Sequence, residues 1–365
     1  MNFEFNEDQR ALADTVQRFI AKDYSFEKRL AIRNSTAGWS REVWRGLADL
    51  GALALNIDED YGGLGYGPQE TGLAMGAFGA GLLLEPYLAS AVIAPALIRR
   101  TASADFQEQW LPAIASGESI VVLAHADARG ATVTELGGNL CGRKAVVAHG
   151  GCADLLLVSA QIPNGDTGLF AVARGADGLT VHDYPTLDGQ RAAEVVLNNT
   201  PATRADAGAA HEHIEAALDI GLAALCAEAV GIMEATVAAT NDYLKTRQQF
   251  GQPIGRFQAL QHRMADMLLH QEQARSMSYL AAMQCTDKDE TARQRTLSAA
   301  KVTVGQACRF IAQNAVQLHG GMGMTDELMV SHWFKRLTAI ELSFGDTDFH
   351  LQRFASLSRQ NLRAA

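Results

Sequence analysis

The segment Arg247-Gln248-Gln249-Phe250-Gly251-Gln252-Pro253-Ile254-Gly255 separates two long stretches of helical character. The stretch before it, Ile214–Thr246, contains no proline and only two glycines. The stretch after it is Gln258–Gln284, and a third such stretch, Thr296–Leu318, follows. Long segments without proline favour α-helices, and glycine and proline between them indicate a tight connection. The last third of the chain is therefore predicted to form an antiparallel helical bundle.

Before these helices, the pattern changes to short runs of β-branched and aliphatic residues separated by turn signals such as Pro163-Asn164-Gly165-Asp166. The predicted strands are Val121–Ala124, Lys144–Ala148, Leu155–Ser159, Leu169–Ala173 and Ala193–Leu197. Several short strands at this spacing predict a compact β-barrel or sandwich.

The first third of the chain again has helical character. Asn6 is a predicted N-cap, and apolar residues recur with helical spacing after it. A glycine-rich break, Asp60–Gly67, interrupts the pattern before helical character resumes from about Gln69 to Ala115. The break has neither the spacing nor the preceding strand of a Rossmann fingerprint, so this kind of nucleotide site is not predicted.

Composition narrows the class of protein. The 365 residues include 31 basic and 41 acidic side chains, for a net charge of −10, which argues against a nucleic-acid-binding protein. The longest apolar stretches, such as Leu88–Ile98, are too short to span a bilayer, so no membrane association is expected. The acidic N-terminus does not resemble a signal peptide, and five cysteines without CxxC spacing favour reduced thiols in the cytoplasm. The His211-Glu212-His213 sequence could hold a metal, but a solvated helix start explains it better, so no metal site is predicted.

Two motifs in the last third have the chemistry of a diphosphate site. An arginine such as Arg247 forms bidentate, charge-assisted hydrogen bonds with phosphate oxygens. Paired glycines such as Gly320-Gly321, within Gln317–Thr325, let backbone N–H groups approach such oxygens closely. Each feature alone has an ordinary explanation, a surface salt bridge for the arginine and a tight turn between helices for the glycines.

Together and in this order, the RxxFG motif at Arg247–Gly251 and the QxxGGxG motif at Gln317–Gly323 resemble the acyl-CoA dehydrogenase family. The resemblance covers essentially the whole chain and also includes Tyr61-Gly62-Gly63. It implies an α+β fold with an N-terminal helical domain (1–118), a middle β-barrel (119–208) and a C-terminal four-helix bundle (209–365).

The resemblance also implies FAD as cofactor, an acyl-CoA thioester as substrate and assembly as a dimer of dimers. In this family, residues of one subunit reach the adenosine diphosphate half of the FAD held by its neighbour. The corresponding cofactor-binding residues are Arg247, Phe250, Gln317, Gly320 and Gly321. The family reaction, α,β-dehydrogenation, needs a carboxylate base for the α-proton and polarisation of the thioester oxygen.

The positions that resemble the flavin-ring contacts of the family are mostly replaced. Where the family has threonine-glutamate-proline and a later glycine-serine, this chain has His125–Gly130. On the following strand, Val146 and Ala148 replace a tryptophan and a threonine. Ordinary drift with compensation nearby is the alternative explanation.

The catalytic base is missing from both positions that the family uses. These positions hold Phe344 and Gly221, and neither side chain can accept a proton. Asp346 is the candidate catalytic base if the loop is reshaped, but an Asp-Thr-Asp sequence before an apolar helix favours a helix cap. Asp219 lies near the second position, but two residues along a helix turn its side chain by about 200°.

This pattern favours one half of a heteromeric enzyme, in which a homologous large subunit supplies the ring contacts and the base. It resembles the small subunits of bacterial pimeloyl-CoA dehydrogenase and of two-chain enzymes of steroid side-chain degradation, so a bulky or dicarboxylic acyl-CoA is expected. Electron-transfer flavoprotein is the expected electron acceptor. Two alternatives stay open, a self-sufficient homotetramer that uses Asp346 and a scaffold of the same fold that binds no flavin.

Overall fold

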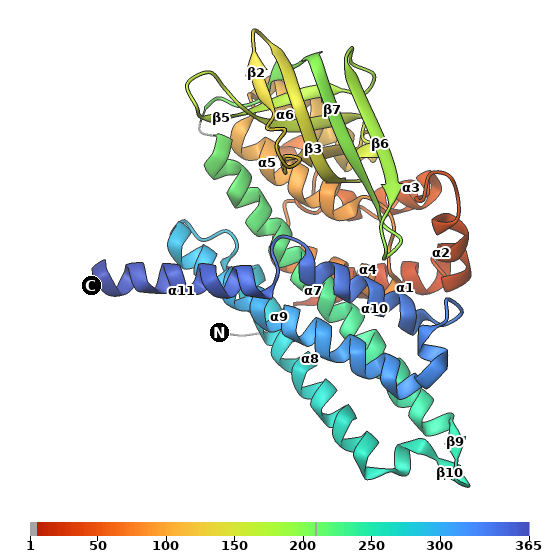
Figure 1. The fold of residues 1–365 in the computed structure, drawn as a ribbon. Coiled ribbons are helices and arrows are strands. Elements are labelled where there is room, and N and C mark those ends of the chain that lie inside the picture. The colour runs from red at the N-terminus through yellow and green to blue at the C-terminus, as the bar shows by residue number, and fades with distance from the viewer. Residues whose placement is uncertain (1–5, 209, 365) are drawn as a thin grey trace. The chain divides into compact units, whose positions relative to one another are not determined.

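The computed structural model describes residues 6–208 and 210–364, with side chains described as far as residue 359. The chain divides into two compact units, each assembled from separate segments (Figure 1). A helical unit comprises Met1–Phe26, Pro68–Leu83 and Leu222–Ala365, and a unit that contains the β-sheet comprises Glu27–Gly67 and Leu84–Gly221. The boundaries at 118/119 and 208/209 stay a prediction, because each of these units is discontinuous in sequence.

Among the described residues, seven α-helices build the helical unit. Asn6 caps the first of them through a capping box with Gln9, as its position in the sequence predicts. The helices are α1 (Glu7–Asp23), α4 (Pro68–Gly81), α7 (Ala210–Thr246, which enters this unit at Leu222), α8 (Gln258–Gln284), α9 (Glu290–His319), α10 (Met329–Leu342) and α11 (Thr347–Ala364). The three long helices that the sequence predicts, α7, α8 and α9, are confirmed.

Helix α7 forms the core of this unit. It is long and apolar enough to cross a membrane, but 89% of its most apolar window is buried inside the protein, which accounts for its composition. Its buried carboxylate, Glu228, forms a bidentate ion pair with Arg336 of α10, with N–O distances of 2.6 and 2.9 Å. Helix α7 also packs closely against α4. A Cβ atom on Gly231 of α7 would lie only 1.9 Å from the carbonyl oxygen of Gly76 of α4.

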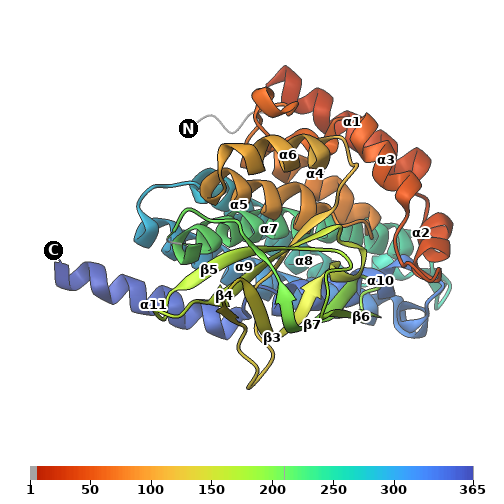
Figure 2. The same ribbon diagram turned by 90° about the horizontal axis from the view of Figure 1, so that it is seen from above.

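The second unit contains a mixed, eight-stranded sheet (Figure 2). The strands follow the order β6-β7-β3-β2-β4-β5-β8, and β1 pairs in parallel with β4. They are β1 (Val121–Ala124), β2 (Thr134–Leu136), β3 (Asn139–Ala148), β4 (Leu155–Gln161), β5 (Thr167–Ala173), β6 (Leu179–Pro185), β7 (Arg191–Pro201) and β8 (Thr203–Arg204). All five predicted strands are present, so the α+β class with a middle β region is confirmed.

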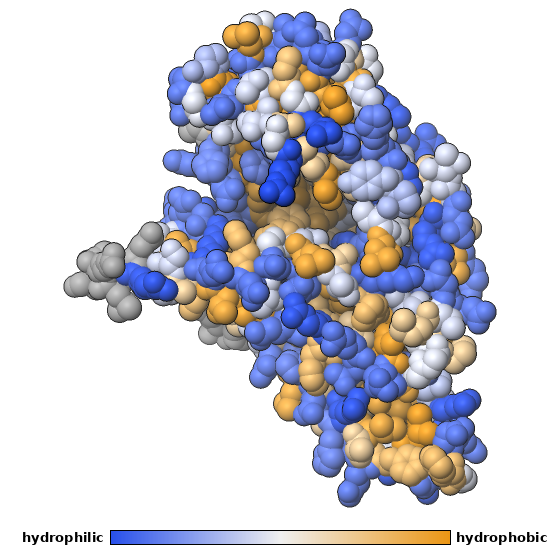
Figure 3. Space-filling model, in the orientation of Figure 1, coloured by the Kyte–Doolittle hydropathy of each residue, from blue (hydrophilic) through white to orange (hydrophobic). Residues whose placement is uncertain are grey.

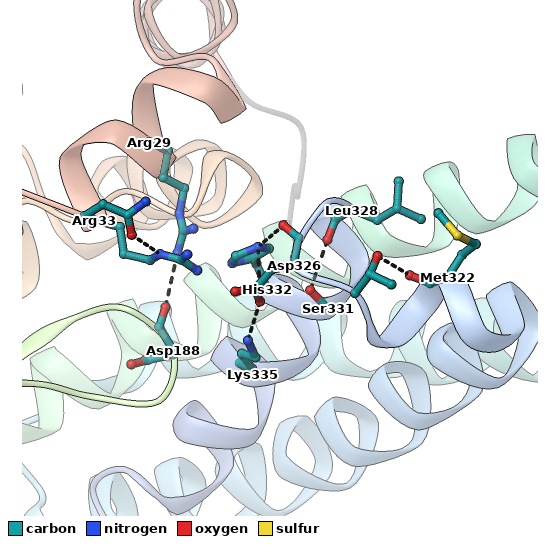
Figure 4. Close-up of polar contacts among 11 residues, drawn as sticks. Arg29, Arg33, Asp188, Met322, Asp326, Leu328, Ser331, His332 and Lys335 are labelled. Carbon is teal, nitrogen blue, oxygen red and sulfur yellow. Dashed lines mark hydrogen bonds and ion pairs between the residues drawn. The ribbon is translucent and has the colours of Figure 1, made fainter.

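Short helices complete this unit. They are α2 (Phe26–Arg33), α3 (Arg41–Asp49), α5 (Ala94–Thr101), α6 (Ala104–Ala115), the 3-10 turns Ala52–Ala54 and Glu59–Tyr61, and a π-helical segment, Tyr87–Ile93. Arg29 of α2 is buried and donates a 3.1 Å hydrogen bond to the carbonyl oxygen of Asp188 (Figure 4). This contact anchors the β6–β7 hairpin to α2.

None of the five cysteines forms a disulfide, as expected, and four of them are buried. His211 and Glu212 are exposed in the first turn of α7, which agrees with a solvated helix start.

Candidate functional site

The RxxFG motif forms a tight hairpin directly after α7. Its strands are β9 (Gln248–Gln249) and β10 (Gln252–Pro253), joined by the two residues Phe250 and Gly251 with φ angles of 53° and 78°. Positive φ at both central residues is typical of a type I′ turn, which suits glycine but strains phenylalanine. The turn leaves the Phe250 side chain 90% exposed, and Arg247 is exposed beside it.

The QxxGGxG motif forms the turn that ends α9. Gly320 follows the last helical residue with φ 60° and ψ −143°, a backbone conformation that favours glycine. A Cβ atom on Gly323 would lie 2.8 Å from the carbonyl oxygen of Val316, so the turn folds back onto α9. Nothing lies within 4 Å of a Cβ built on Gly320 or Gly321, so a ligand can approach their backbone.

The structure brings the two motifs to the same end of the helical unit. Tyr243, on the last turn of α7, stacks on His319 with ring centroids 4.4 Å apart. Its hydroxyl donates a 3.5 Å hydrogen bond to the carbonyl oxygen of His319, the residue before Gly320. Apolar side chains gather on the surface where β9 and β10 lie (Figure 3). All five predicted cofactor-binding residues have exposed backbone or side chains at this end.

These residues fit the adenosine diphosphate half of FAD. The exposed guanidinium of Arg247 carries the charge that a diphosphate needs, and the open backbone of Gly320-Gly321 lets its oxygens come close. The exposed ring of Phe250 offers an apolar face to the rest of the nucleotide. Nothing in the geometry tests these roles directly, so they stay predictions.

Asp346 lies at the N-terminus of α11. Its Oδ1 accepts a 2.8 Å hydrogen bond from the backbone N–H of Phe349, which is N-cap geometry, and its side chain is exposed. A catalytic base needs a desolvated site, and the described residues of this unit do not enclose the Asp346 carboxylate. Near the alternative position, Gly221, the side chain of Asp219 is buried on α7.

The segment before α11 is held by buried groups that sequence patterns do not reveal. Lys301 of α9 is fully buried, and its Nζ donates to the carbonyl oxygens of Glu341 and Gly345, both at 2.8 Å. His350 lies 2.9 Å from the carbonyl oxygen of Phe344, so its Nε2 carries the hydrogen. Burial lowers the pKa of Lys301 and lowers the pKa of His350 to about 4. Phe344 is held with a φ of 58°, which is unusual for a residue other than glycine.

In the β-containing unit, the two replaced ring-contact positions lie on β3. Val146 has a φ of 51° and is 66% exposed, at an irregularity in the pairing of β3 with β7. Ala148 is also exposed. Neither side chain can donate a hydrogen bond, so these side chains offer no polar contact to a cofactor.

A buried polar network lies behind them. The Nζ of Lys144 donates to His125 O (2.8 Å), Asp127 Oδ1 (2.6 Å) and Ser159 Oγ (3.1 Å), which uses its three hydrogens. The Ser159 hydroxyl is then available to donate to His125 Nδ1, 2.9 Å away. Burial, and next the charge of Lys144, lower the pKa of His125, so its ring is neutral at pH 7. In the segment that replaces threonine-glutamate-proline, His125 and Asp127 are therefore hydrogen-bonded within the protein.

Comparison with known families matches both ends of the chain. Residues 6–118 match the family described as acyl-CoA dehydrogenase, N-terminal domain, and residues 212–356 match acyl-CoA dehydrogenase, C-terminal domain.

Individual relatives cover nearly the whole chain. "Acyl-CoA dehydrogenase FadE27" of Mycobacterium tuberculosis is 28% identical over 97% of both chains. "Acyl-CoA dehydrogenase IpdE2" of Mycolicibacterium smegmatis is 27% identical and covers 91% of this chain and 92% of its own.

Solved structures agree with these matches. A chain from the structure of a variant of the Tcur3481-Tcur3483 steroid ACAD superposes with a TM-score of 0.89 at 26% identity, covering 98% of this chain and 99% of its own. A chain of the ChsE4-ChsE5 complex from Mycobacterium tuberculosis has a TM-score of 0.89 at 25% identity and covers 99% of both chains.

Proposed function

Because the chain belongs to the acyl-CoA dehydrogenase family, whose cofactor is FAD, we propose that it is the small subunit of a two-chain acyl-CoA dehydrogenase. In this proposal, it pairs with a homologous large subunit in an α2β2 assembly and completes the FAD site of that partner. The large subunit supplies the flavin-ring contacts and the catalytic base.

One observation carries the proposal. The groups suited to the adenosine diphosphate half are kept, exposed and brought together at one end of the helical unit. The groups suited to the ring and the base are replaced by Val146, Ala148 and Phe344. A scaffold that binds no flavin has no need of the kept groups. A self-sufficient enzyme needs the ring contacts and the catalytic base that have been replaced.

The named relatives support the two-chain interpretation. The ChsE4-ChsE5 structure is described as a complex, and the Tcur3481-Tcur3483 structure carries the names of two chains of a steroid enzyme. We therefore extend the proposal to a bulky acyl-CoA of the steroid side-chain type, to electron-transfer flavoprotein as acceptor, and to a cytoplasmic location.

In the assembled enzyme, FAD supplies the acceptor for the hydride that leaves the β-carbon. Arg247 offers paired N–H donors to the diphosphate, which neutralises charge that would otherwise be desolvated at the interface. The backbone of Gly320-Gly321 offers uncharged donors to the same group. Phe250 packs against the nucleotide, and its fixed turn limits the entropy lost on binding.

The visible absorption spectrum tests the proposal. The chain purified alone should be colourless, and the chain co-purified with its large subunit should be yellow, with about one FAD per pair. A lone chain that binds one FAD per chain and is bleached by an acyl-CoA would refute the proposal.

The self-sufficient alternative has its own test at Asp346. Asparagine is as good an N-cap as aspartate but cannot act as a base. In the proposed assembly, Asp346→Asn should leave both turnover and thermal stability unchanged, whereas Asp346→Ala should lower stability by about 1 kcal/mol. Loss of turnover in a stable Asp346→Asn variant would favour the alternative.

A further inference from the structure

Tyr243 is the residue that contacts both halves of the proposed diphosphate site. Its backbone carbonyl accepts a 2.8 Å hydrogen bond from the N–H of Arg247, four residues later and on the same side of the helix. Its ring and hydroxyl contact His319, which directly precedes Gly320. The Tyr243 backbone therefore holds the residue that begins the RxxFG motif, and the Tyr243 side chain contacts the residue that precedes the glycine turn.

The His319 ring is fixed in one state. Its Nδ1 lies 2.8 Å from the carbonyl oxygen of Ala315, and because a carbonyl can only accept, Nδ1 carries the hydrogen. Burial lowers the pKa of His319, so the ring is neutral at pH 7. It cannot swing away from Tyr243 without leaving its own N–H unpaired, so the stacked arrangement has one orientation.

The glycine turn packs back onto the end of α9, next to His319. A Cβ atom on Gly323 would lie 2.8 Å from the carbonyl oxygen of Val316 and 3.1 Å from the His319 Cβ. The far side of the turn is held by different contacts, in which His332 and Lys335 of α10 bond the backbone and side chain of Asp326 at 3.0 and 2.8 Å (Figure 4). The near side, which carries Gly320-Gly321, directly follows His319, the residue that stacks on Tyr243.

We propose that Tyr243 is a positioning residue, which through His319 sets the separation between Arg247 and Gly320-Gly321 and so determines affinity for the diphosphate of a dinucleotide. This inference rests on the proposed function and names a part of the site that the motifs do not include. Stacking carries the effect, since a 3.5 Å hydrogen bond is weak. The Tyr243→Phe variant should therefore keep the affinity for the dinucleotide, and the Tyr243→Leu variant should lose it.

The test uses the assembled two-chain enzyme after its FAD has been removed. Binding of added FAD is measured by the change in flavin fluorescence in wild type, Tyr243→Phe and Tyr243→Leu. The phenylalanine variant should bind within about twofold of wild type. The leucine variant should bind at least tenfold more weakly, about 1.4 kcal/mol, yet keep the wild-type kcat once FAD is saturating. A general structural defect would lower kcat at saturation as well.

Tyr279→Leu is the matched control, because Tyr279 is also a half-buried tyrosine, on α8 of the same unit. Its FAD affinity should equal that of wild type. If Tyr243→Leu does not assemble, His319→Ala removes the same stack from α9 and should give the same loss of affinity.

The outcomes separate this inference from the proposed function. Wild-type affinity in a folded Tyr243→Leu or His319→Ala complex overturns the positioning role while the two-chain function stands. A wild-type complex that binds no FAD overturns the proposed function itself.

Discussion

Several residues other than glycine adopt positive φ in the described part of the chain, and three of them lie at positions discussed above. These three are Val146, Phe250 and Phe344, with φ angles of 51°, 53° and 58°. Such backbone costs about 1–3 kcal/mol and persists only when surrounding contacts enforce it. At Phe344 these contacts are the buried Lys301 and His350. The positive φ angles at positions 146 and 344 therefore mark backbone that its surroundings hold in place.

The buried ammonium of Lys144 gives a prediction for stability. Lys144→Met leaves the Asp127 carboxylate and two further acceptors without their donor, so the free energy of unfolding should fall by about 2 kcal/mol. Arg143→Met on the same strand removes only an exposed ion pair with Glu194, and should cost at most about 1 kcal/mol. Urea unfolding of both variants measures the difference, and equal losses would contradict the role of the buried network.

His350 gives a prediction for pH dependence. An unfolded histidine binds a proton near pH 6.5, whereas the folded His350 has a pKa of about 4. As the pH falls through this interval, the unfolded chain gains a proton that the folded chain does not bind. The free energy of unfolding should therefore fall, with His350 contributing up to about 3 kcal/mol.

His350→Gln provides the comparison, because glutamine can still donate to Phe344 O but does not titrate. Urea unfolding at pH 7, 6 and 5 should show a shallower loss of stability in this variant. Parallel profiles for wild type and variant would show that His350 does not contribute.

Among the elements, α4 and α7 pack with glycine at their closest approach. In Gly231→Ala, the new methyl group would lie 1.9 Å from the carbonyl oxygen of Gly76, so the helices must separate and stability should fall by about 1–3 kcal/mol. Gly72→Ala on α4 is the matched control, because its Cβ would meet only Ala227 at an ordinary 3.6 Å. Since alanine favours helix more than glycine, this control should be neutral or stabilising by thermal melting.

The spacing of apolar residues predicted the helices and strands that contain enough apolar residues to form a pattern. The long helices α7, α8 and α9 and five strands were predicted from the sequence. Strands β2, β6 and β8 were missed because most of their residues face solvent, so their sequences lack an apolar run. The π-helical segment Tyr87–Ile93 was predicted as ordinary helix because periodicity does not distinguish the two.

The residues of the candidate site also fall into those that the sequence indicates and those that it does not. Arg247, Phe250 and the glycine pair could be found because local motifs carry them. Tyr243, Lys144 and Lys301 could not, since their roles depend on partners far away in the chain, such as Glu341, forty residues from Lys301. Only the folded chain shows that these polar groups are buried.

At the scale of the whole molecule, several large apolar side chains of the helical unit are exposed. They include Leu268 and Leu269 on α8 and Phe349 and Leu351 on α11. In the proposed two-chain enzyme, these side chains are candidates for contact with the large subunit. We expect amide hydrogen exchange in α8 and α11 to slow when the large subunit is added. The β2–β3 hairpin, at Gly137-Gly138, should exchange at the same rate in both states, and unchanged exchange in α8 and α11 would contradict this expectation.

The Glu228–Arg336 ion pair has a consequence for how the chain is made. The two residues are 108 positions apart, so at about 5–20 residues per second the ribosome adds Arg336 roughly 5–20 s after Glu228. During that interval the long, apolar helix α7 has neither the cation that pairs with Glu228 nor the later helices of its unit. We therefore expect the nascent chain to depend on chaperone protection until α10 has emerged, and chains truncated before α10 to aggregate.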